Sequence, residues 1–211
     1  MVRANAGGVS PDSEQKRLEA LYRFGILGPD PEPSLDRVTR LAAAVMGAPI
    51  ALLSFEDKDR HWFKSRFGTS MTETPRDTSF CHHAMLGKTC FTVEDTHLDE
   101  RFAQNPIVTG APFVRTYAGA PIITPNGDAL GTLCVLFDKV TPLGDQQLSA
   151  LTDLAQLVVE ELNLREMARD SLAAHTAQRD ALSAARQSEA FLESVAGVAG
   201  VGGWEMDLND M

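Results

Sequence analysis

Cysteine is scarce in this sequence. Cys81, Cys90 and Cys134 are the three cysteines among 211 residues, and no two of them form a Cys-x-x-Cys pair. An odd number of scattered cysteines does not build a disulfide framework, and the missing pairs exclude the usual structural zinc sites. We therefore expect reduced thiols and no bound metal.

Long apolar runs and an excess of basic residues are also lacking. No stretch approaches the ~18 consecutive apolar residues of a membrane span, and the N-terminus does not join a basic start to an apolar block. Lysine and arginine total 19 against 29 aspartates and glutamates, a formal net charge of −10, so no positive field is available for nucleic acid. We expect a cytoplasmic protein with no nucleic-acid and no membrane partner.

Apolar residues make up 44% of the sequence, which is enough to bury a core. The length suits one domain of ~100–200 residues and a remnant. A helix is predicted over 34–46, where Leu35, Val38 and Leu41 begin a three- and four-residue spacing. A shorter helix is expected over 12–24.

Two hairpins are predicted on either side of a helical insert. The second surrounds Asn126-Gly127, a strong turn signal because both positions tolerate φ > 0. A helix near 79–85 and a strand at 90–93 lie between the hairpins. The four hairpin strands are 49–55, 61–67, 114–123 and 129–137. The predicted fold class is α+β, a central antiparallel sheet of about five to six strands with helices packed on it, plus a long C-terminal helix.

One uninterrupted helix is predicted after Gly144, since neither glycine nor proline occurs again before Gly197. Its apolar spacing thins beyond Arg165 into a weak seam, of the kind that pairs two copies in registers close in energy. A solvated linker is an alternative of equal weight. We expect a homodimer through this helix. The seam residues are Leu151, Val158, Leu162, Leu172 and Leu182.

The order of elements and eight short motifs resemble a GAF domain. The motifs are Ala51-Leu-Leu-Ser-Phe-Glu-Asp57, Arg60-His-Trp-Phe-Lys-Ser65, Pro75-Arg-Asp-Thr-Ser-Phe-Cys-His-His-Ala84, Val93-Glu-Asp95, Asp99-Glu-Arg-Phe102, Asn105-Pro-Ile-Val-Thr-Gly110, Arg115-Thr-Tyr-Ala-Gly-Ala-Pro121 and Gly131-Thr-Leu-Cys134. They are similar to a bacterial subgroup at the front of sensor histidine kinases and diguanylate cyclases. The end of the chain is similar to the start of a PAS domain.

These resemblances imply four parts. They are a flexible leader (1–13), a GAF sensor domain (14–165), a signalling helix or coiled-coil linker (166–190) and the start of a truncated PAS domain (191–211). A strand is expected over 204–208. Because one strand cannot bury its apolar face alone, we expect Met211 to lie inside a longer protein.

In GAF domains small ligands sit on one face of the sheet beneath the helical insert, and the resemblance implies such a pocket here. The candidate lining residues are Trp62, Phe80, Cys81, His82, His83, Arg115, Tyr117 and Thr132. The ligand itself is not implied. Each residue also has a simpler explanation: Cys81 as a small buried residue, the aromatic rings as core, and Arg115 as a partner of Asp95 or Asp99 rather than of a bound carboxylate or phosphate.

Metal and thiol chemistry are not expected at Cys81. Neighbouring side chains on a helix point about 100° apart, so Cys81 and His82 do not form a joint metal site. The Cys-His pair precedes the position where bilin-binding GAF domains attach their chromophore, so we expect no covalent bilin. No cysteine lies in the 105–112 loop, where the GAF-type free methionine sulfoxide reductases are expected to carry their nucleophile.

The resemblance implies a cytoplasmic sensory module without catalysis of its own. It would pass a ligand or partner state through the long helix to a downstream PAS domain and an output domain. A histidine kinase is the preferred output, and a diguanylate cyclase or phosphodiesterase is the alternative. Two readings from other classes are a ligand-free dimerisation scaffold and a thiol-based small-molecule reductase.

Overall fold

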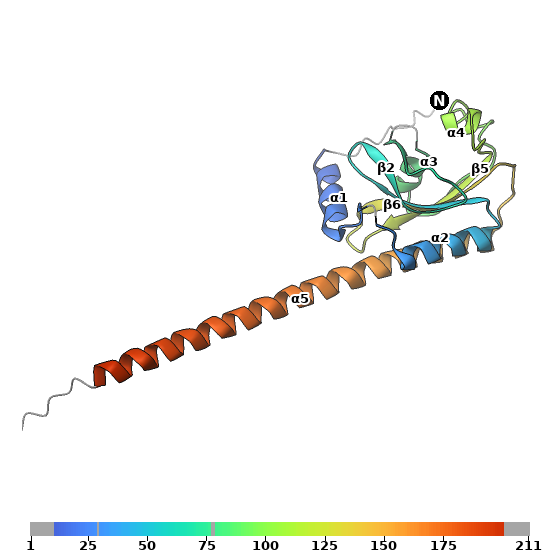
Figure 1. Ribbon diagram of the computed structural model, residues 1–211. Helices are drawn as coiled ribbons and strands as arrows, with labels where there is room; N and C mark the ends of the chain where they lie inside the picture. The colour runs from blue at the N-terminus through green and yellow to red at the C-terminus, as the bar shows by residue number, and fades with distance from the viewer. Residues whose placement is uncertain (1–10, 29, 77–78, 201–211) are drawn as a thin grey trace, which may run out of the picture. The chain divides into compact units, whose positions relative to one another are not determined.

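A central antiparallel sheet organises the domain in the computed structural model, which describes residues 11–28, 30–76 and 79–200 (Figure 1). The strands lie in the order β3-β2-β1-β6-β5-β4. Their bounds are β1 Ile50–Glu56, β2 Arg60–Phe67, β3 Glu73–Pro75, β4 Phe91–Val93, β5 Thr116–Ile123 and β6 Ala129–Phe137. The predicted α+β fold with a sheet of five to six strands is confirmed.

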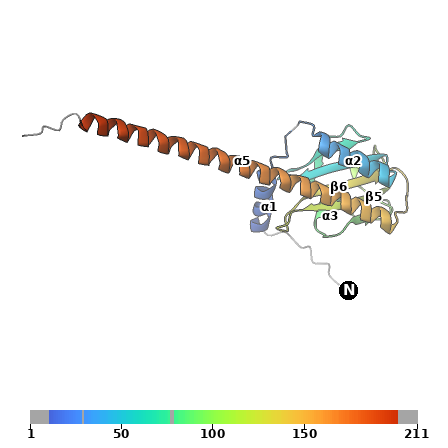
Figure 2. The same ribbon diagram turned by 90° about the horizontal axis from the view of Figure 1, so that it is seen from below.

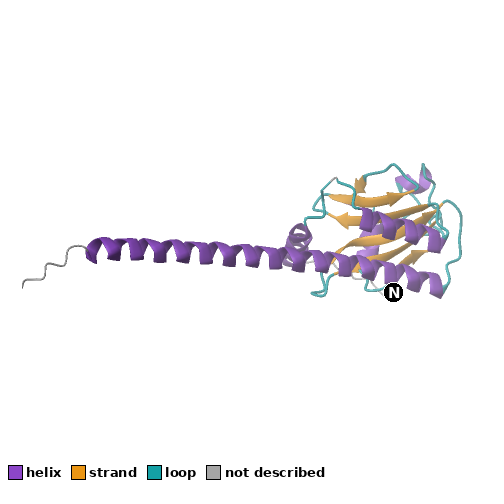
Figure 3. Ribbon diagram, turned by 60° about the horizontal axis from the view of Figure 1, so that its bottom comes forward, coloured by secondary structure: helices purple, strands orange, loops and turns teal. Residues whose placement is uncertain are grey.

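Helices cover both faces of this sheet (Figures 2 and 3). On one side lie α1, α2 and the first part of α5; α3 lies on the other, with α4 in the insert between β4 and β5. The bounds are α1 Pro11–Phe24, α2 Pro33–Met46, α3 Phe80–Met85, α4 Pro106–Thr109 and α5 Asp145–Gly200. Within the described ranges, no helix is both long and apolar enough to cross a bilayer.

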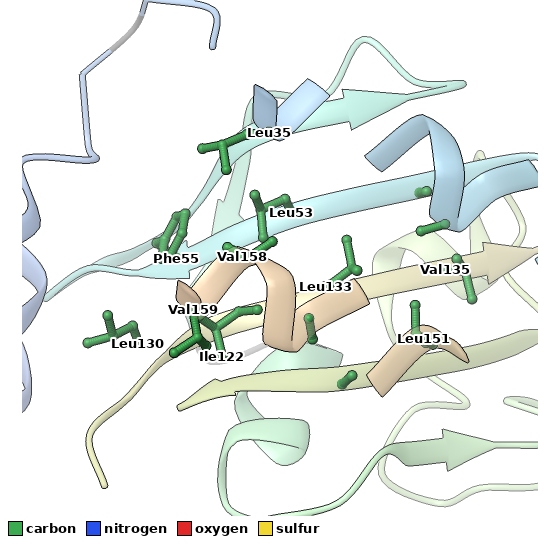
Figure 4. Close-up of a cluster of buried hydrophobic side chains, with 14 of the residues drawn as sticks. Leu35, Leu53, Phe55, Ile122, Leu130, Leu133, Val135, Leu151, Val158 and Val159 are labelled. Carbon is green, nitrogen blue, oxygen red and sulfur yellow. The ribbon is translucent and has the colours of Figure 1, made fainter. Parts of the chain in front are cut away.

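The face under α1, α2 and α5, called here the helix-side face, holds the larger core. Side chains such as Leu53 of β1 and Leu133 of β6 point toward Leu151 and Val158 of α5 (Figure 4). All four are fully buried. At roughly 1.5–3 kcal/mol per large buried apolar side chain, this layer is the main source of the domain's stability.

The opposite face, called here the insert-side face, holds a smaller core of alternate residues from the same strands. Leu52 of β1 and Leu136 of β6 lie there. Three aromatic rings stack beside them: the Phe80 centroid is 4.2 Å from that of Phe102 and 5.1 Å from that of Tyr117. Successive side chains of a strand point to opposite faces, so Leu52 lies on this face and its neighbour Leu53 on the helix-side face.

Both predicted hairpins are present. β1 pairs antiparallel with β2, and β5 pairs antiparallel with β6. Gly127 has a φ of 91°, as the Asn-Gly turn requires. The expected helix at 79–85 is α3, which begins where the Ser79 side chain accepts a hydrogen bond from the backbone of Cys81. Strand β3 and helix α4 were not expected, because each is too short to leave a periodic signal.

The predicted uninterrupted helix is also confirmed, as α5. Residues up to Asn163 belong to the domain, and residues from Leu164 onward form a second unit. In this second unit every side chain from Met167 to Val195 is exposed. Residues 191–200 continue the helix. The strand expected over 204–208 and most of the expected leader lie outside the described residues.

Three of the five residues assigned to a dimer seam belong instead to the core of their own domain. Leu151 and Val158 are 0% exposed and Leu162 is 3% exposed. The three- and four-residue spacing that predicts a seam also suits a helix lying on a sheet, and here the sheet buries it. These three side chains are therefore not free to meet a second copy. Leu172 and Leu182 are exposed.

Replacing Leu151 by alanine should lower the free energy of unfolding by about 2–5 kcal/mol, because it leaves a cavity under α5. Urea unfolding would measure this, and the loss should not depend on protein concentration. Leu157→Ala, at a half-exposed position of the same helix, is the matched control and should change stability much less. If the loss of unfolding free energy in Leu151→Ala disappeared at high protein concentration, Leu151 would instead belong to an interface between two copies of the chain.

Candidate functional site

A cavity of about 280 Å³ lies on the insert-side face of the sheet. Its floor comes from β1, β2, β5 and β6, and its cover comes from α3, α4, β3 and the loop before β3. The lining residues are Leu52, His61, Phe63, Met71, Thr74, Pro75, Ser79, Phe80, Cys81, Asn105, Pro106, Ile107, Tyr117, Cys134 and Leu136. The cavity occupies the place that the GAF resemblance implies, beneath the helical insert.

The lining is chiefly apolar. Among the described residues that line the cavity there is no aspartate, glutamate, lysine or arginine. The polar groups are an imidazole, a few hydroxyls, one amide and two thiols. Burying an unpaired charge here would cost several kcal/mol, as is typical of apolar interiors. The cavity therefore suits a small uncharged molecule with few polar atoms.

The two thiols lie next to each other in this lining. The Sγ atoms of Cys81 and Cys134 are 3.7 Å apart, and both residues are buried. The Tyr117 hydroxyl donates to Cys81 Sγ over 3.4 Å, and the Ser54 hydroxyl lies 3.7 Å from the same sulfur. Gly119 leaves room for Tyr117, because a Cβ at that position would lie 2.2 Å from the tyrosine oxygen.

These contacts shift the pKa values of the two thiols in opposite directions. Burial alone would raise the pKa of Cys81, but hydrogen bonds and the nearby His61 outweigh it and the pKa is lowered. The pKa of Cys134 is raised, because it hydrogen-bonds to Cys81 and is buried. Burial also raises the pKa of Tyr117, which keeps its hydroxyl protonated and able to donate. Cys81 is thus the more reactive thiol of the pair.

His61 is fully buried behind the thiols. Its Nε2 lies 2.7 Å from Ser54 Oγ, which in turn is 3.0 Å from the Thr132 hydroxyl. Its Nδ1 has no hydrogen-bond partner among the described residues, and the carboxylate of Glu56 is 3.8 Å away. An unpartnered buried nitrogen is costly, so Nδ1 of His61 is an atom that a further hydrogen-bonding partner would stabilise.

Glu56 connects this interior to the surface. It is 1% exposed; Arg76 Nε lies 2.8 Å and His82 Nδ1 3.0 Å from its Oε1. Burial alone would raise the pKa of Glu56, but His82 and Arg76 outweigh it and the pKa is lowered. The hydrogen bond to Glu56 raises the pKa of His82. Arg76 also binds Glu14 of α1, so the same ion pairs tie α1 to the sheet.

Of the eight residues predicted to line the pocket, the structure places three in it: Phe80, Cys81 and Tyr117. Thr132 is buried one contact away, at Ser54. Trp62 lies on the other face of β2, where the Arg60 guanidinium sits 4.7 Å from its ring centroid.

The other predicted lining residues, His82, His83 and Arg115, lie outside the cavity. His82 binds Glu56, and the His83 ring packs 4.9 Å from that of Phe102. Arg115 holds Asp95 in a bidentate pair of 3.1 and 2.8 Å, the simpler of its two explanations. Cys81 Sγ lies against Cys134, whereas His82 Nδ1 lies 3.0 Å from Glu56. Within the described ranges no three of the side chains that commonly bind metals are grouped together.

Sequence reasoning missed His61, Cys134 and Glu56. His61 could have been found, because it lies two residues before the apolar Phe63 and so shares its face in a strand. Cys134 lies two residues before Leu136 in β6 and so shares its face of the sheet, which is a second signal of the same kind. Glu56 gave a weaker signal, a carboxylate that ends a run of apolar residues.

Replacing Glu14 by glutamine should make stability less dependent on acid pH. The hydrogen bond from Arg17 is the largest of the effects that lower the pKa of Glu14 from 4.5 to about 2. A lowered carboxyl pKa adds stability above pH 4.5, which is lost as the pH falls toward 2. The thermal midpoints of wild type and variant should therefore differ at pH 7 and converge as the pH falls toward 2. Glu160→Gln is the exposed control, and a pH-independent gap would contradict the ion-pair explanation.

Comparisons with known proteins agree with this geometry. A family model described as the GAF domain matches residues 30–162. A cyclic di-GMP phosphodiesterase of Pseudomonas aeruginosa is 37% identical over 154 residues, which are 72% of this chain and 26% of the relative. The chain thus spans about a quarter of the length of this curated relative.

Solved structures share the fold at low identity. A free methionine-R-sulfoxide reductase from Neisseria meningitidis aligns with a TM-score of 0.55 at 14% identity, over 79% of this chain and 99% of that one. The GAF domain of an Acinetobacter phosphoenolpyruvate-protein phosphotransferase gives 0.54 at 15% identity, over 74% and 95%. The family match covers more than half of the sequence, and the six-stranded antiparallel sheet with its helices is consistent with the GAF fold. The chain belongs to the GAF domain family.

Proposed function

We propose that this chain is a cytoplasmic sensory module of a larger signalling protein, and that the cavity on its insert-side face is where it binds a small molecule. The observation that carries the proposal is the apolar cavity of about 280 Å³, lined jointly by the sheet and by the helical insert. A site built from two layers responds to its ligand by adjusting the insert on the sheet. The ligand class is a small uncharged molecule, since no charged side chain among the described residues lines the site.

The sheet supplies a direct route from this cavity to α5. In β6, Cys134 and Leu136 line the cavity, while Leu133 and Val135 face α5. In β1, Leu52 and Leu53 divide in the same way. A ligand that shifts these strands changes the packing of Leu151 and Val158, and α5 continues from there to Gly200. The ligand can bias the helix only by its difference in affinity for the two arrangements.

The relative from Pseudomonas aeruginosa bears on the output. A cyclic di-GMP phosphodiesterase with a similar region supports an output domain of cyclic di-GMP turnover, the alternative to the histidine kinase that the sequence alone favoured. We place the output domain beyond the chain, after a PAS domain that begins near its end. The expected homodimer forms through the exposed part of α5, at Leu172 and Leu182.

Filling the cavity should abolish ligand binding. Leu136→Trp places a larger side chain in the site, and Leu41→Trp, at an exposed position on α2, is the control. Native mass spectrometry of the gently purified chain should show a retained mass on the wild type and on the control but not on the cavity variant. A bare wild-type chain would favour the ligand-free scaffold.

Replacing Leu172 and Leu182 together by aspartate should convert the dimer to a monomer. Buried like charges in a helical seam cost several kcal/mol, more than a weak seam supplies. Light scattering during size-exclusion chromatography would measure the mass. Ala177→Asp with Ala184→Asp adds the same charge on the opposite side of the helix and should leave the dimer intact. A monomeric wild type would make this helix a linker.

A further inference from the structure

Two thiols, a hydroxyl pair and a buried imidazole meet at the cavity, and ligand binding by itself gives them no role. Cys81 comes from α3 and Cys134 from β6, so the insert and the sheet each supply one thiol. Both sulfurs line the cavity and lie 3.7 Å apart. That distance is van der Waals contact between sulfur atoms, close enough for a bond of about 2 Å to form after a modest shift.

We propose that Cys81 and Cys134 are a thiol site that reduces small uncharged hydroperoxides and becomes a disulfide. The proposal rests on the sensory function proposed above, because it names one class of molecule that the cavity detects, and this molecule is consumed in the reaction and leaves no retained mass. The disulfide would join α3 covalently to the central strand β6. The insert would then be fixed to the sheet.

Cys81 is the thiol that attacks. Two hydroxyls donate to its sulfur, that of Tyr117 at 3.4 Å and that of Ser54 at 3.7 Å, and the Cys134 sulfur lies 3.7 Å away. Donors aimed at a sulfur favour the thiolate, which is the nucleophilic form. The titratable groups that face Cys81 are Cys134, Tyr117 and His61, with the carboxylate of Glu56 behind His61.

The proton of Cys81 has a route away from the sulfur. Ser54 Oγ contacts Cys81 Sγ on one side and His61 Nε2, at 2.7 Å, on the other. When Nε2 takes this proton both ring nitrogens carry an N–H, and the one at Nδ1 faces the Glu56 carboxylate, 3.8 Å away. Glu56 is in turn bound to His82, whose side chain is 36% exposed. His61 is a positioning and proton-holding residue, and the reacting atoms are the two sulfurs.

The chemistry balances without any other reactant. The Cys81 thiolate attacks the terminal oxygen of the hydroperoxide, an S–O bond forms, the O–O bond breaks, and the departing alkoxide takes the proton from His61. Cys134 then attacks the sulfenic sulfur, an S–S bond forms, and hydroxide leaves with the Cys134 proton as water. The two thiols lose two electrons and the hydroperoxide gains them. The products are a disulfide, an alcohol or water, and one water.

Hydrogen peroxide on the full chain tests the proposal in a Cys90→Ser background. Intact mass after quenching should show a loss of 2 Da, and alkylation of the denatured chain should then label two fewer thiols than in the untreated chain. Adding Cys134→Ser should stop at a sulfenic acid on Cys81, trapped by dimedone once the chain is denatured. Adding Cys81→Ser instead should leave Cys134 reduced, with an unchanged circular dichroism spectrum confirming the fold.

Cys90 is the matched control, since burial raises its pKa to about 11 and it lies outside the cavity lining. In the Cys81→Ser, Cys134→Ser variant it should oxidise at least tenfold more slowly than Cys81 does in the Cys90→Ser chain. His61→Gln should slow the oxidation of Cys81 about tenfold at pH 7 and shift its rate profile to higher pH. Equal rates for Cys81 and Cys90, or a disulfide that never forms, would overturn the proposal. A retained ligand mass on a chain that resists peroxide would overturn it while leaving the sensory function standing.

Discussion

The burial of β1 and β6 on both faces is the constraint on which the rest of this domain depends. Every residue of β1 is buried, and in β6 every residue after Ala129 is buried. Each side chain must therefore enter either the packed core under α5 or the insert-side face with its cavity. Because side chains alternate between the two faces of a strand, a residue in the core under α5 and a residue on the insert-side face are direct neighbours in the sequence. In the proposed signalling route, binding in the cavity would therefore change the packing under α5 through a single strand.

The same constraint explains the ion pairs around Glu56. A carboxylate at the end of a doubly buried strand is stable only where cations reach it. Arg76 and His82 do so from one side, while His61 faces it from the interior. The charges that hold α1 in place thus also touch the groups behind the thiols. The ion pairs that hold α1 and the groups that take part in the proposed thiol reaction thus share one set of contacts. A substitution that changes the stability of this region will also alter the surroundings of the thiols.

Much of the fold was predictable because local patterns specify it. The Asn-Gly turn, the spacing of Leu35, Val38 and Leu41, and the absence of helix breakers after Gly144 each describe a few neighbouring residues, and all three were confirmed. The site was less predictable. Phe80, Cys81 and Tyr117 were found through the resemblance, whereas His61 and Cys134 join them only across strand pairings of long sequence separation. Apolar spacing in α5 was misread at Leu151, Val158 and Leu162, since periodicity shows that a face is apolar and not what covers it.

By itself the sequence determined all elements except the short β3 and α4, their order, the charge balance and the family, because these follow from composition, turns, periodicity and short motifs. Tertiary structure decided which faces meet. It placed Arg115 on Asp95 instead of in the cavity, gave three of the five expected seam residues to the domain's own core, and brought two cysteines 53 residues apart to within 3.7 Å. The physical reason is that pairing between distant strands and helices is chosen by the total burial of the domain. No local stretch of residues contains that information.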